Sequence, residues 1–468
     1  MEKHSINRVL EVNETKLIYT LEAFFERKGE IMARLIQNGV GFSLQDDGYE
    51  AAKEAAEKAL ASLDETPALS LVFYAGEYDP LAINRALKET FKGTEFVGGS
   101  TDAVIYEGTI YPKGIVITSM YSDYVHFGIS SADNVSKSPR ETAKKIIRQA
   151  VGSIKIDHYV DSYMAFTRVK KGNISDLIRM PAFFVFAFTR GFQPTRMGNE
   201  DLIIDGIQDE LGYYVPIFGG SLGNDMDKVF SNTPYDIVSL HSGKIMKDGL
   251  ITVFAISDIK YAASYAHGAE PLNKIGSISQ VKNGGFVVSK INDTPIYQWY
   301  ANQIGISVKE FRLKILYYTQ KYPLGFPDGY GNIIMRAGGV PFGKDELSYI
   351  APLKENTPIF LMNLENNKRL MQANNELLAD IHKHLNKNKL FSRWLRADMS
   401  FVVSCSSRRR VLDQKSSHRE LAELSKLSRS PLFGFCSFGE IGGKPAGQSH
   451  FHHLCTNVFN FYDKLMSE

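Results

Sequence analysis

The chain has 468 residues, of which 44% are hydrophobic and 23% are charged. These fractions are typical of an ordinary globular protein, and the length is enough for two or three domains. The formal net charge is only +2 at pH 7. A charge this small gives no general attraction to nucleic acid or to an acidic surface, so we expect no nucleic-acid partner.

The sequence shows no pattern of a targeting or membrane segment. The first residues lack the continuous apolar stretch of a signal peptide, and no apolar run reaches the ~18 residues of a membrane helix. The three cysteines, Cys405, Cys436 and Cys455, are too few for a disulfide framework and suit a reducing compartment. We therefore expect a cytoplasmic protein without a membrane span.

The N-terminal part, residues 1–38, is predicted to be a helical extension. Apolar residues recur on one stripe of a helix over residues 16–37, and Gly39 and Gly41 end the pattern. Such an amphipathic helix either packs on its own domain, which we favour, or makes a contact in a homodimer.

A first αβ unit is predicted over residues 68–130. An apolar strand at 68–74 leads to a helix that begins at Asp79-Pro80, with proline at its first position. A second strand ends in the turn Gly98-Gly99-Ser100. Residues 114–120 and 124–129 then read as a hairpin.

The same order returns over residues 181–258. The predicted elements are a strand at 181–188, a helix at 199–211, a strand that ends in Gly219-Gly220-Ser221, and a closing strand at 249–257. We interpret the two turns as equivalent and the two segments as an internal duplication. The duplicated half is expected to form one domain, residues 39–260.

Residues 261–465 are predicted to form a second domain, a mixed sheet with helices. Its last part reads as a strand at 400–405, a helical connector at 412–427 and a buried strand at 431–438. The whole chain is therefore expected to be an α/β protein, a duplicated αβ half packed on a mixed-sheet half, with its boundary near residues 258–266.

Two charged residues follow the two predicted strands of that last part. Arg408 comes after the strand that ends at Cys405, and Glu440 follows Gly439 in a glycine turn. A helical crossover would place both at the same edge of the sheet, where open α/β sheets bind ligands. Arg408 suits a ligand carboxylate and Glu440 suits an ammonium group. The alternative, weighed equally, is a structural ion pair between the two.

The Gly-Gly-Ser turns could present backbone N–H groups to an anion. Ser100, Thr101 and Ser221 are the candidate ligand residues there. Neither turn has the lysine of a P-loop, so a plain tight turn is the favoured interpretation.

Cys405 is a candidate for reactivity because Arg408-Arg409-Arg410 follows it, and nearby guanidinium groups favour a thiolate. A small buried residue is the plainer interpretation. No Ser-His-Asp set, paired carboxylates or His-Glu-x-x-His appears. An enzyme that uses Cys405 or Glu440 is therefore an alternative that ranks behind a binding protein.

The tail His450-Phe-His452-His453-Leu-Cys455 suggests a metal or haem site. On a strand, however, His450 and His452 would share one face while His453 and Cys455 share the other. A closed four-ligand site is therefore not expected. A single axial histidine for haem stays open.

Several of these motifs together resemble the FIST proteins, a family of sensory domains. The resemblance rests on Cys405-Ser-Ser-Arg408, on Gly434-Phe followed by Gly439-Glu440-Ile441, on His267-Gly268, and on His452. The family's asparagine after this last histidine is replaced by His453. The first Gly-x-Ser turn also departs from the family after Thr101.

The resemblance runs from about Gly39 to Tyr462. It implies a cytoplasmic sensor of a small ligand, with amino acids or their relatives the usual proposal for the family. Since no output domain is recognised, the signal would pass to a separate partner such as a kinase or cyclase. The resemblance also implies a second candidate, a haem-based NO sensor, with His452 and His267 as the candidate ligands. We expect no cofactor and no metal.

Overall fold

The computed structural model describes residues 34–154, 183–193, 196–231, 233–365, 367–385, 396–412 and 414–466. The chain divides into two compact units, Met1–Leu35 and Ile36–Glu468, and the fold below is that of the second. Most of the predicted N-terminal helix lies outside the described residues. Its predicted end is wrong, because residues 34–36 are not helical and Gln37 begins a strand.

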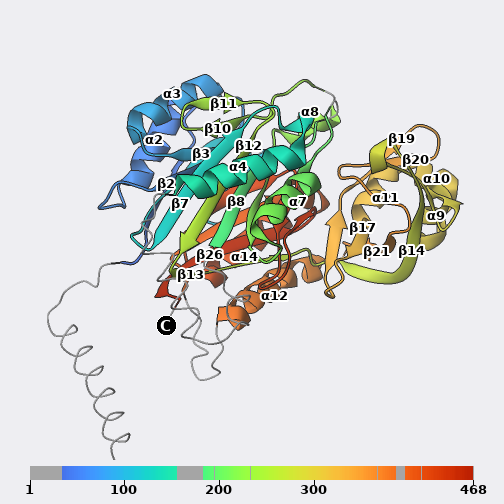
Figure 1. Cartoon of the computed structure of the whole chain (residues 1–468). Helices are drawn as coiled ribbons and strands as arrows, with labels where there is room; N and C mark the ends of the chain where they lie inside the picture. Colours follow the sequence, from blue (N-terminus) through green and yellow to red (C-terminus); the bar gives the residue numbers. More distant parts are fainter. Residues whose placement is uncertain are drawn as a thin grey trace, which may run out of the picture. The chain divides into compact units, whose positions relative to one another are not determined.

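Three six-stranded sheets form the main body (Figure 1). Sheet I consists, in spatial order, of β1 (Gln37–Ser43), β6 (Gly114–Tyr121), β2 (Leu69–Ala75), β3 (Phe96–Ser100), β10 (Ser239–His241) and β11 (Lys244–Met246). Sheet II consists of β7 (Val125–Ala132), β12 (Leu250–Ser257), β8 (Phe183–Arg190), β9 (Ile217–Leu222), β24 (Glu440–Gly442) and β25 (His450–His452). Sheet III consists of β13 (Ile259–Ala266), β26 (Thr456–Leu465), β22 (Met399–Cys405), β23 (Leu432–Ser437), β4 (Ala103–Tyr106) and β5 (Thr109–Tyr111).

The three sheets are built by one rule. In each sheet, the third and fourth strands are parallel and every other neighbouring pair is antiparallel. The chain runs through this pattern three times, over residues 37–121, 125–257 and 259–465, which we call repeats 1, 2 and 3. The predicted duplication therefore has a third copy in the structure.

Each repeat gives a hairpin to the sheet of another repeat. The hairpin β4–β5 of repeat 1 joins sheet III, β10–β11 of repeat 2 joins sheet I, and β24–β25 of repeat 3 joins sheet II. The exchange is cyclic, so every repeat both gives and receives one hairpin. Strand pairing gives partners to backbone polar groups that would otherwise be buried without a hydrogen bond. The three repeats therefore depend on one another for stability.

Backbone hydrogen bonds repeat around the same cycle. The backbone N–H just after β3, β9 or β23 donates to a carbonyl near the end of the corresponding strand in another repeat. Gly223 N donates to Ser100 O (3.0 Å), Phe438 N to Ser221 O (3.0 Å) and Asp102 N to Cys436 O (3.4 Å). The two predicted Gly-Gly-Ser turns are thus equivalent, and Cys436 holds the third position.

Helices of the three repeats also correspond. One helix of each repeat lies before the first of its two parallel strands. These helices are α2 (Gly48–Leu60) before β2, α4 (Pro139–Ser153) before β8 and α12 (Asn367–Leu385) before β22. The helices between the parallel strands are α3 (Pro80–Phe91), α7 (Glu200–Leu211) and α14 (Gln414–Ser428). Shorter helical segments are η1 (Val135–Lys137), α8 (Met226–Phe230) and α13 (Ser406–Val411). Caps match the sequence expectation: Asp79 accepts from Leu81 N and precedes Pro80.

Phenylalanines from all three sheets form a shared core. Phe73 of sheet I stacks on Phe435 of sheet III with ring centroids 4.3 Å apart, and Phe186 of sheet II lies 5.0 Å from Phe459 of sheet III. Each side chain is fully buried. Burial of one such ring contributes roughly 2–3 kcal/mol, so this cluster holds the sheets together.

Repeat 3 contains a large insertion between β13 and α12. Its strands form a further sheet from β14 (Glu270–Lys282), β15 (Val287–Ile291), β16 (Thr294–Pro295), β17 (Leu324–Pro327), β18 (Ile333–Arg336), β19 (Gly338–Phe342), β20 (Glu346–Tyr349) and β21 (Pro358–Asn363). Its helices are α9 (Ile296–Ile304), α10 (Val308–Leu313) and α11 (Ile315–Lys321), and a short 3₁₀ turn, η2, covers Asn283–Gly285. The insertion has an apolar core of its own around Tyr300 and Phe311.

The structure confirms the mixed α/β class and corrects two predictions. Residues 114–120 and 124–129 are not a hairpin, because β6 lies in sheet I and β7 in sheet II. The predicted halves do not have separate sheets either, since β4–β5 and β24–β25 cross between them. The residue bounds 39–260 and 261–465 stay a prediction.

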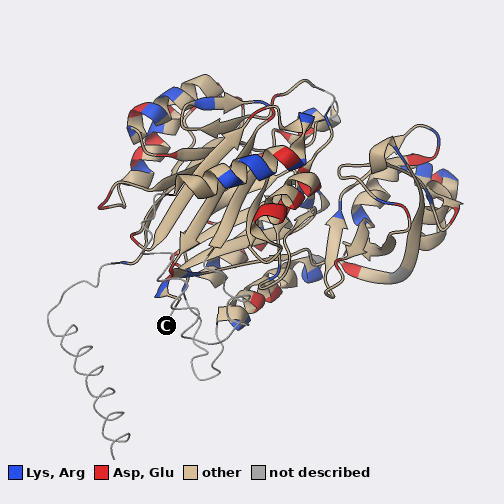
Figure 2. Cartoon of the chain, viewed as in Figure 1, with Lys and Arg blue, Asp and Glu red and all other residues tan. Residues whose placement is uncertain are grey.

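Charges of both signs are interspersed on the helices in the view of Figure 2, while the strands carry few. In the parts of the chain that the structure describes, no helix combines the length and apolarity needed to span a membrane.

Candidate functional site

The predicted crossover is present where the sequence placed it. β22 ends at Cys405 and β23 at Ser437, the two strands are parallel, and α14 connects them. Their carboxyl ends therefore lie at one edge of sheet III. Glu440 lies three residues after Ser437, the end of β23. It begins β24, a strand of sheet II, and pairs there with Gly220. The predicted carboxylate thus lies where two sheets meet.

Glu440 is the centre of a buried polar cluster and is 0% exposed. Ser437 Oγ donates to Glu440 Oε1 over 2.5 Å, and the backbone N of Cys455 donates to Oε2 over 3.3 Å. The Cys455 thiol lies 3.3 Å from both Glu440 Oε2 and Asn457 Oδ1. Cys405 lies near enough for Glu440 to raise the pKa of its thiol, after burial, which is the larger cause. We call these five residues the carboxyl–thiol cluster.

Burial decides the protonation of this cluster. It raises the pKa of Glu440 to about 8, and the hydrogen bonds from Ser437 and Cys455 offset this only in part. Burial likewise raises the pKa of the Cys405 and Cys455 thiols. The sequence expectation that nearby arginines favour a Cys405 thiolate is therefore corrected, because the cluster is neutral at pH 7.

Arg408 is paired, but its partner is Glu420 of α14. Its Nη2 lies 2.5 Å from Glu420 Oε1 and its Nε 2.9 Å from the same oxygen, and both side chains are 2% exposed. The guanidinium also donates to the backbone carbonyls of His267, Leu370 and Leu454. A ligand carboxylate would have to displace Glu420 from this group.

One peptide group separates Arg408 from Glu440. The carbonyl of Leu454 accepts from Arg408 Nη1 over 3.1 Å, and the N–H of Cys455 in the same peptide donates to Glu440. The two predicted residues are therefore brought close together without a direct ion pair. A movement of this peptide group would change the hydrogen bonds of both Arg408 and Glu440.

Ser221 and Gly439 adjoin the carboxyl–thiol cluster. Ser221 N donates to Gly439 O over 2.8 Å, and Ser221 Oγ donates to Glu200 Oε1 over 2.6 Å. Glu200 is 2% exposed, and burial raises its pKa. Sequence reasoning missed Glu200 because an acid in the first turn of a helix is usually a solvated residue.

Ser100 and Thr101 are placed differently from Ser221. Ser100 Oγ donates to Gly223 O over 2.8 Å, and Thr101 Oγ1 donates to backbone carbonyls of Tyr74 and Ala103. Both side chains are buried. These hydroxyls bond backbone carbonyls, and both Gly-Gly-Ser segments lie within strands, β3 and β9, so the prediction that they are turns is wrong.

The candidate haem ligands are packed inside the protein. His452 is 0% exposed, its Nε2 lies 3.1 Å from Gly442 O, and its ring lies 4.1 Å from the Tyr265 ring. His267 Nδ1 accepts from Ala269 N. The His452 ring is thus held on its face by Tyr265 and at Nε2 by Gly442, while its buried Nδ1 has no hydrogen-bond partner among the described residues. Within the described stretches, no three His, Cys, Asp or Glu residues are grouped to hold a metal ion.

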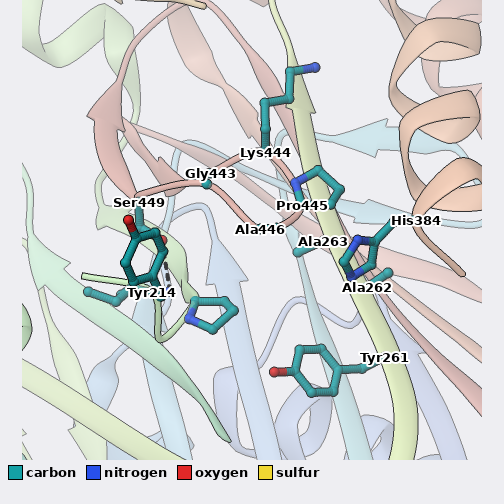
Figure 3. Close-up of a pocket in the computed structure, with 13 residues that line it drawn as sticks. Tyr214, Tyr261, Ala262, Ala263, His384, Gly443, Lys444, Pro445, Ala446 and Ser449 are labelled. Carbon is teal, nitrogen blue, oxygen red and sulfur yellow. Dashed lines mark hydrogen bonds between the residues drawn. The ribbon is translucent and has the colours of Figure 1, made fainter. Parts of the chain in front are cut away.

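An open pocket lies at the other end of β24 (Figure 3). The loop 443–449, which joins β24 to β25, forms one wall, and Tyr214, Tyr261 and His384 line the rest. Lys444 Nζ lies 2.6 Å from Asp380 Oδ2 and 2.8 Å from Tyr265 O. Lys444 is a lining residue whose amino group is directed away from the hollow in Figure 3, and its partner Asp380 lies outside the lining. Sequence reasoning missed this pair because Lys444 and Asp380 are far apart in the chain.

Comparison with known proteins identifies two family models. The FIST N domain matches residues 68–294, and the FIST C domain matches residues 297–443. No curated protein matches.

Similar solved structures are distant. Cyanuric acid hydrolase from A. caulinodans covers 91% of this chain and 99% of its own, with 8% identity and a TM-score of 0.32. A chorismatase covers the same shares, with 8% identity and a TM-score of 0.30.

Proposed function

Because the chain belongs to the FIST family, we propose that it is a sensory protein that binds an amino acid or a related small molecule. FIST domains are generally small-ligand sensory domains in signal transduction. The observation that carries the proposal is that the two domain models together match most of the chain. We propose a cytoplasmic location and a separate signalling partner, such as a kinase or cyclase.

The pocket of Figure 3 supports an amino acid as ligand. A free amino acid carries one ammonium and one carboxylate, so its site needs an anion and a cation a few ångströms apart in a mostly apolar hollow. Lys444 lines the pocket, and Asp380, its ion-pair partner, lies outside the lining; the two side chains are 26% and 40% exposed. Arg408 and Glu440, by contrast, are buried. We therefore propose that the ligand binds in this pocket and exchanges its own charged groups for the contacts of the Lys444–Asp380 pair.

The carboxyl–thiol cluster supports a response to such a ligand. Glu440 begins β24, and the pocket loop 443–449 begins where β24 ends. A ligand that moves this loop would change the position of β24 and therefore the contacts of Glu440. A sensor works by such differential binding, because a ligand that prefers one arrangement stabilises it.

Thermal unfolding of the purified chain with a panel of amino acids tests the proposal. We expect at least one to raise the melting temperature, since a ligand that binds only the folded state stabilises it. Lys444→Ala should abolish the rise, whereas Lys383→Ala, an exposed lysine of α12, should retain it. A rise that survives Lys444→Ala would contradict the pocket, and the lack of any rise would contradict an amino-acid ligand.

A further inference from the structure

Two of the three cysteines face each other across a pair of antiparallel strands. Ser404 of β22 pairs with Thr456 of β26, so the same register places Cys405 opposite Cys455. The hydrogen bond from Cys405 N to Cys455 O, 3.0 Å long, confirms this pairing. Residues at such positions have Cα atoms about 5.5 Å apart, which lies within the range that disulfides span.

Both thiols lie on the same face of sheet III. The Cys455 thiol lies 3.3 Å from Glu440 Oε2, and opposed residues of paired antiparallel strands point to the same face, so the Cys405 side chain lies on that face beside it. Cys436 of β23 lies on the opposite face, where it packs with Ala103 and Leu421. The pleat of the sheet therefore selects one pair among the three cysteines.

We propose that Cys405 and Cys455 form a reversible disulfide across the ends of β22 and β26, which makes the carboxyl–thiol cluster a site of redox modification. The oxidant is a peroxide. This inference goes beyond the proposed ligand binding and does not rest on it.

The reaction balances with the groups in place. The ionised Glu440 carboxylate takes the proton of the Cys455 thiol, and the resulting thiolate attacks one oxygen of hydrogen peroxide. The O–O bond breaks, Cys455 becomes a sulfenic acid, and the departing oxygen leaves as water with the proton from Glu440. The Cys405 sulfur then attacks the sulfenic sulfur, and a second water leaves. Two thiols and one peroxide thus give one disulfide and two waters.

Burial sets the pace of this reaction. The thiols are at most 2% exposed, and burial raises the pKa of both, so we expect oxidation to be slow at neutral pH and faster as Glu440 ionises. The disulfide would withdraw the Cys455 thiol donor from Glu440. It would also tie the end of β22, from which Arg408 follows, to the peptide that Arg408 contacts.

The experiment treats the folded, full-length protein with excess hydrogen peroxide at several pH values. Remaining thiols are alkylated after unfolding, and peptides are mapped without reduction. We expect a Cys405–Cys455 crosslink, a mass loss of two hydrogen atoms, and recovery of both thiols with dithiothreitol. The Cys436→Ser variant should give the same crosslink at the same rate. Glu440→Gln should slow its formation by about tenfold or more, because the base is removed.

Three outcomes would overturn the proposal. One is a crosslink that contains Cys436. Another is conversion of Cys405 or Cys455 to sulfinic acid without a crosslink. The last is that both thiols persist in the folded protein through a treatment that oxidises all thiols in urea. Since these readings come from the wild-type protein, they do not depend on whether a cysteine variant folds.

Discussion

Glu440 holds its proton in the folded protein at a pH where a free glutamate would have lost it. Burial raises its pKa to about 8 from the ordinary glutamate value of 4.5. A raised carboxyl pKa gives stability that is complete below the unfolded value and is lost as the pH rises through the folded value. The groups that influence the pKa of Glu440 are Ser437, Cys455 and Cys405.

We therefore expect the free energy of unfolding to fall between about pH 5 and pH 8.5, by on the order of 4 kcal/mol from Glu440 alone. Glu440→Gln should remove this part of the pH dependence. Urea unfolding at a series of pH values measures it. Glu423→Gln, on the exposed face of α14, is the control and should keep the wild-type slope. An unchanged slope in Glu440→Gln would show that Glu440 is ionised in the folded state at neutral pH.

The buried ion pair between Arg408 and Glu420 is expected to contribute strongly to stability. Removal of one partner of a buried ion pair leaves the other charge unpaired, which costs roughly 3–5 kcal/mol. We expect Glu420→Gln to lower the free energy of unfolding by that amount, as measured in urea at pH 7. Arg419→Ala breaks an exposed pair with Glu423 on the same helix and should cost under about 1 kcal/mol. Equal effects of the two substitutions would contradict the buried pairing.

Gly434 shows at the scale of a strand why the sheets need glycine at equivalent positions. A Cβ atom there would lie 1.7 Å from the carbonyl oxygen of Val402, and the equivalent Gly98 and Gly219 meet carbonyl oxygens at 1.8 and 2.1 Å. Contacts this short cannot be accommodated, so β22 and β23 would have to separate.

We expect Gly434→Ala to lower the melting temperature strongly or to prevent folding, with a cost of about 3 kcal/mol or more. Gly152→Ala is the matched control, because a Cβ atom there would meet nothing within 4 Å. In helix α4 that change should leave stability equal or raise it by up to ~1 kcal/mol. Differential scanning calorimetry of both variants measures the melting temperatures. An unchanged melting temperature in Gly434→Ala would contradict the described spacing of β22 and β23.

Local signals in the sequence predicted the crossover beside the site, and long-range pairing decided the rest. The apolar runs of β22 and β23, joined by one helical pattern, correctly predicted two parallel strands whose carboxyl ends share an edge of sheet III, whereas Glu440 belongs to sheet II. The partner Glu420 was not predicted, because helical periodicity does not show which residue of α14 meets Arg408. The route of β24 into sheet II was equally hidden, since strand pairing across the chain leaves no local pattern.

The third repeat was missed for a related reason. The large insertion separates β13 from α12. In β23, Gly434-Phe435-Cys436 stands where the other two repeats have Gly-Gly-Ser. The shared strand order and the hydrogen bonds of Ser100, Ser221 and Cys436 reveal the equivalence.

For the whole molecule, the hairpin exchange predicts that no repeat folds by itself. A fragment of residues 34–258 would keep sheet I complete, but β9 would lose its partner β24, and β4–β5 would lose sheet III. Exposed strand edges promote aggregation. We expect this fragment to be insoluble or unfolded by circular dichroism, and co-expression with residues 259–466 to recover a soluble complex. A folded, monomeric fragment would contradict the exchange.

The cyclic exchange also limits how such a protein changes during evolution. In an open array, repeats are added or lost one at a time because each touches only its neighbours. Here the giving and receiving of hairpins closes after three steps, so a fourth copy would find no vacant place and a lost copy would leave two others incomplete. New material enters instead through connections outside the exchange, as the insertion between β13 and α12 did. Growth by insertion rather than by copy number is the form of novelty that this architecture permits.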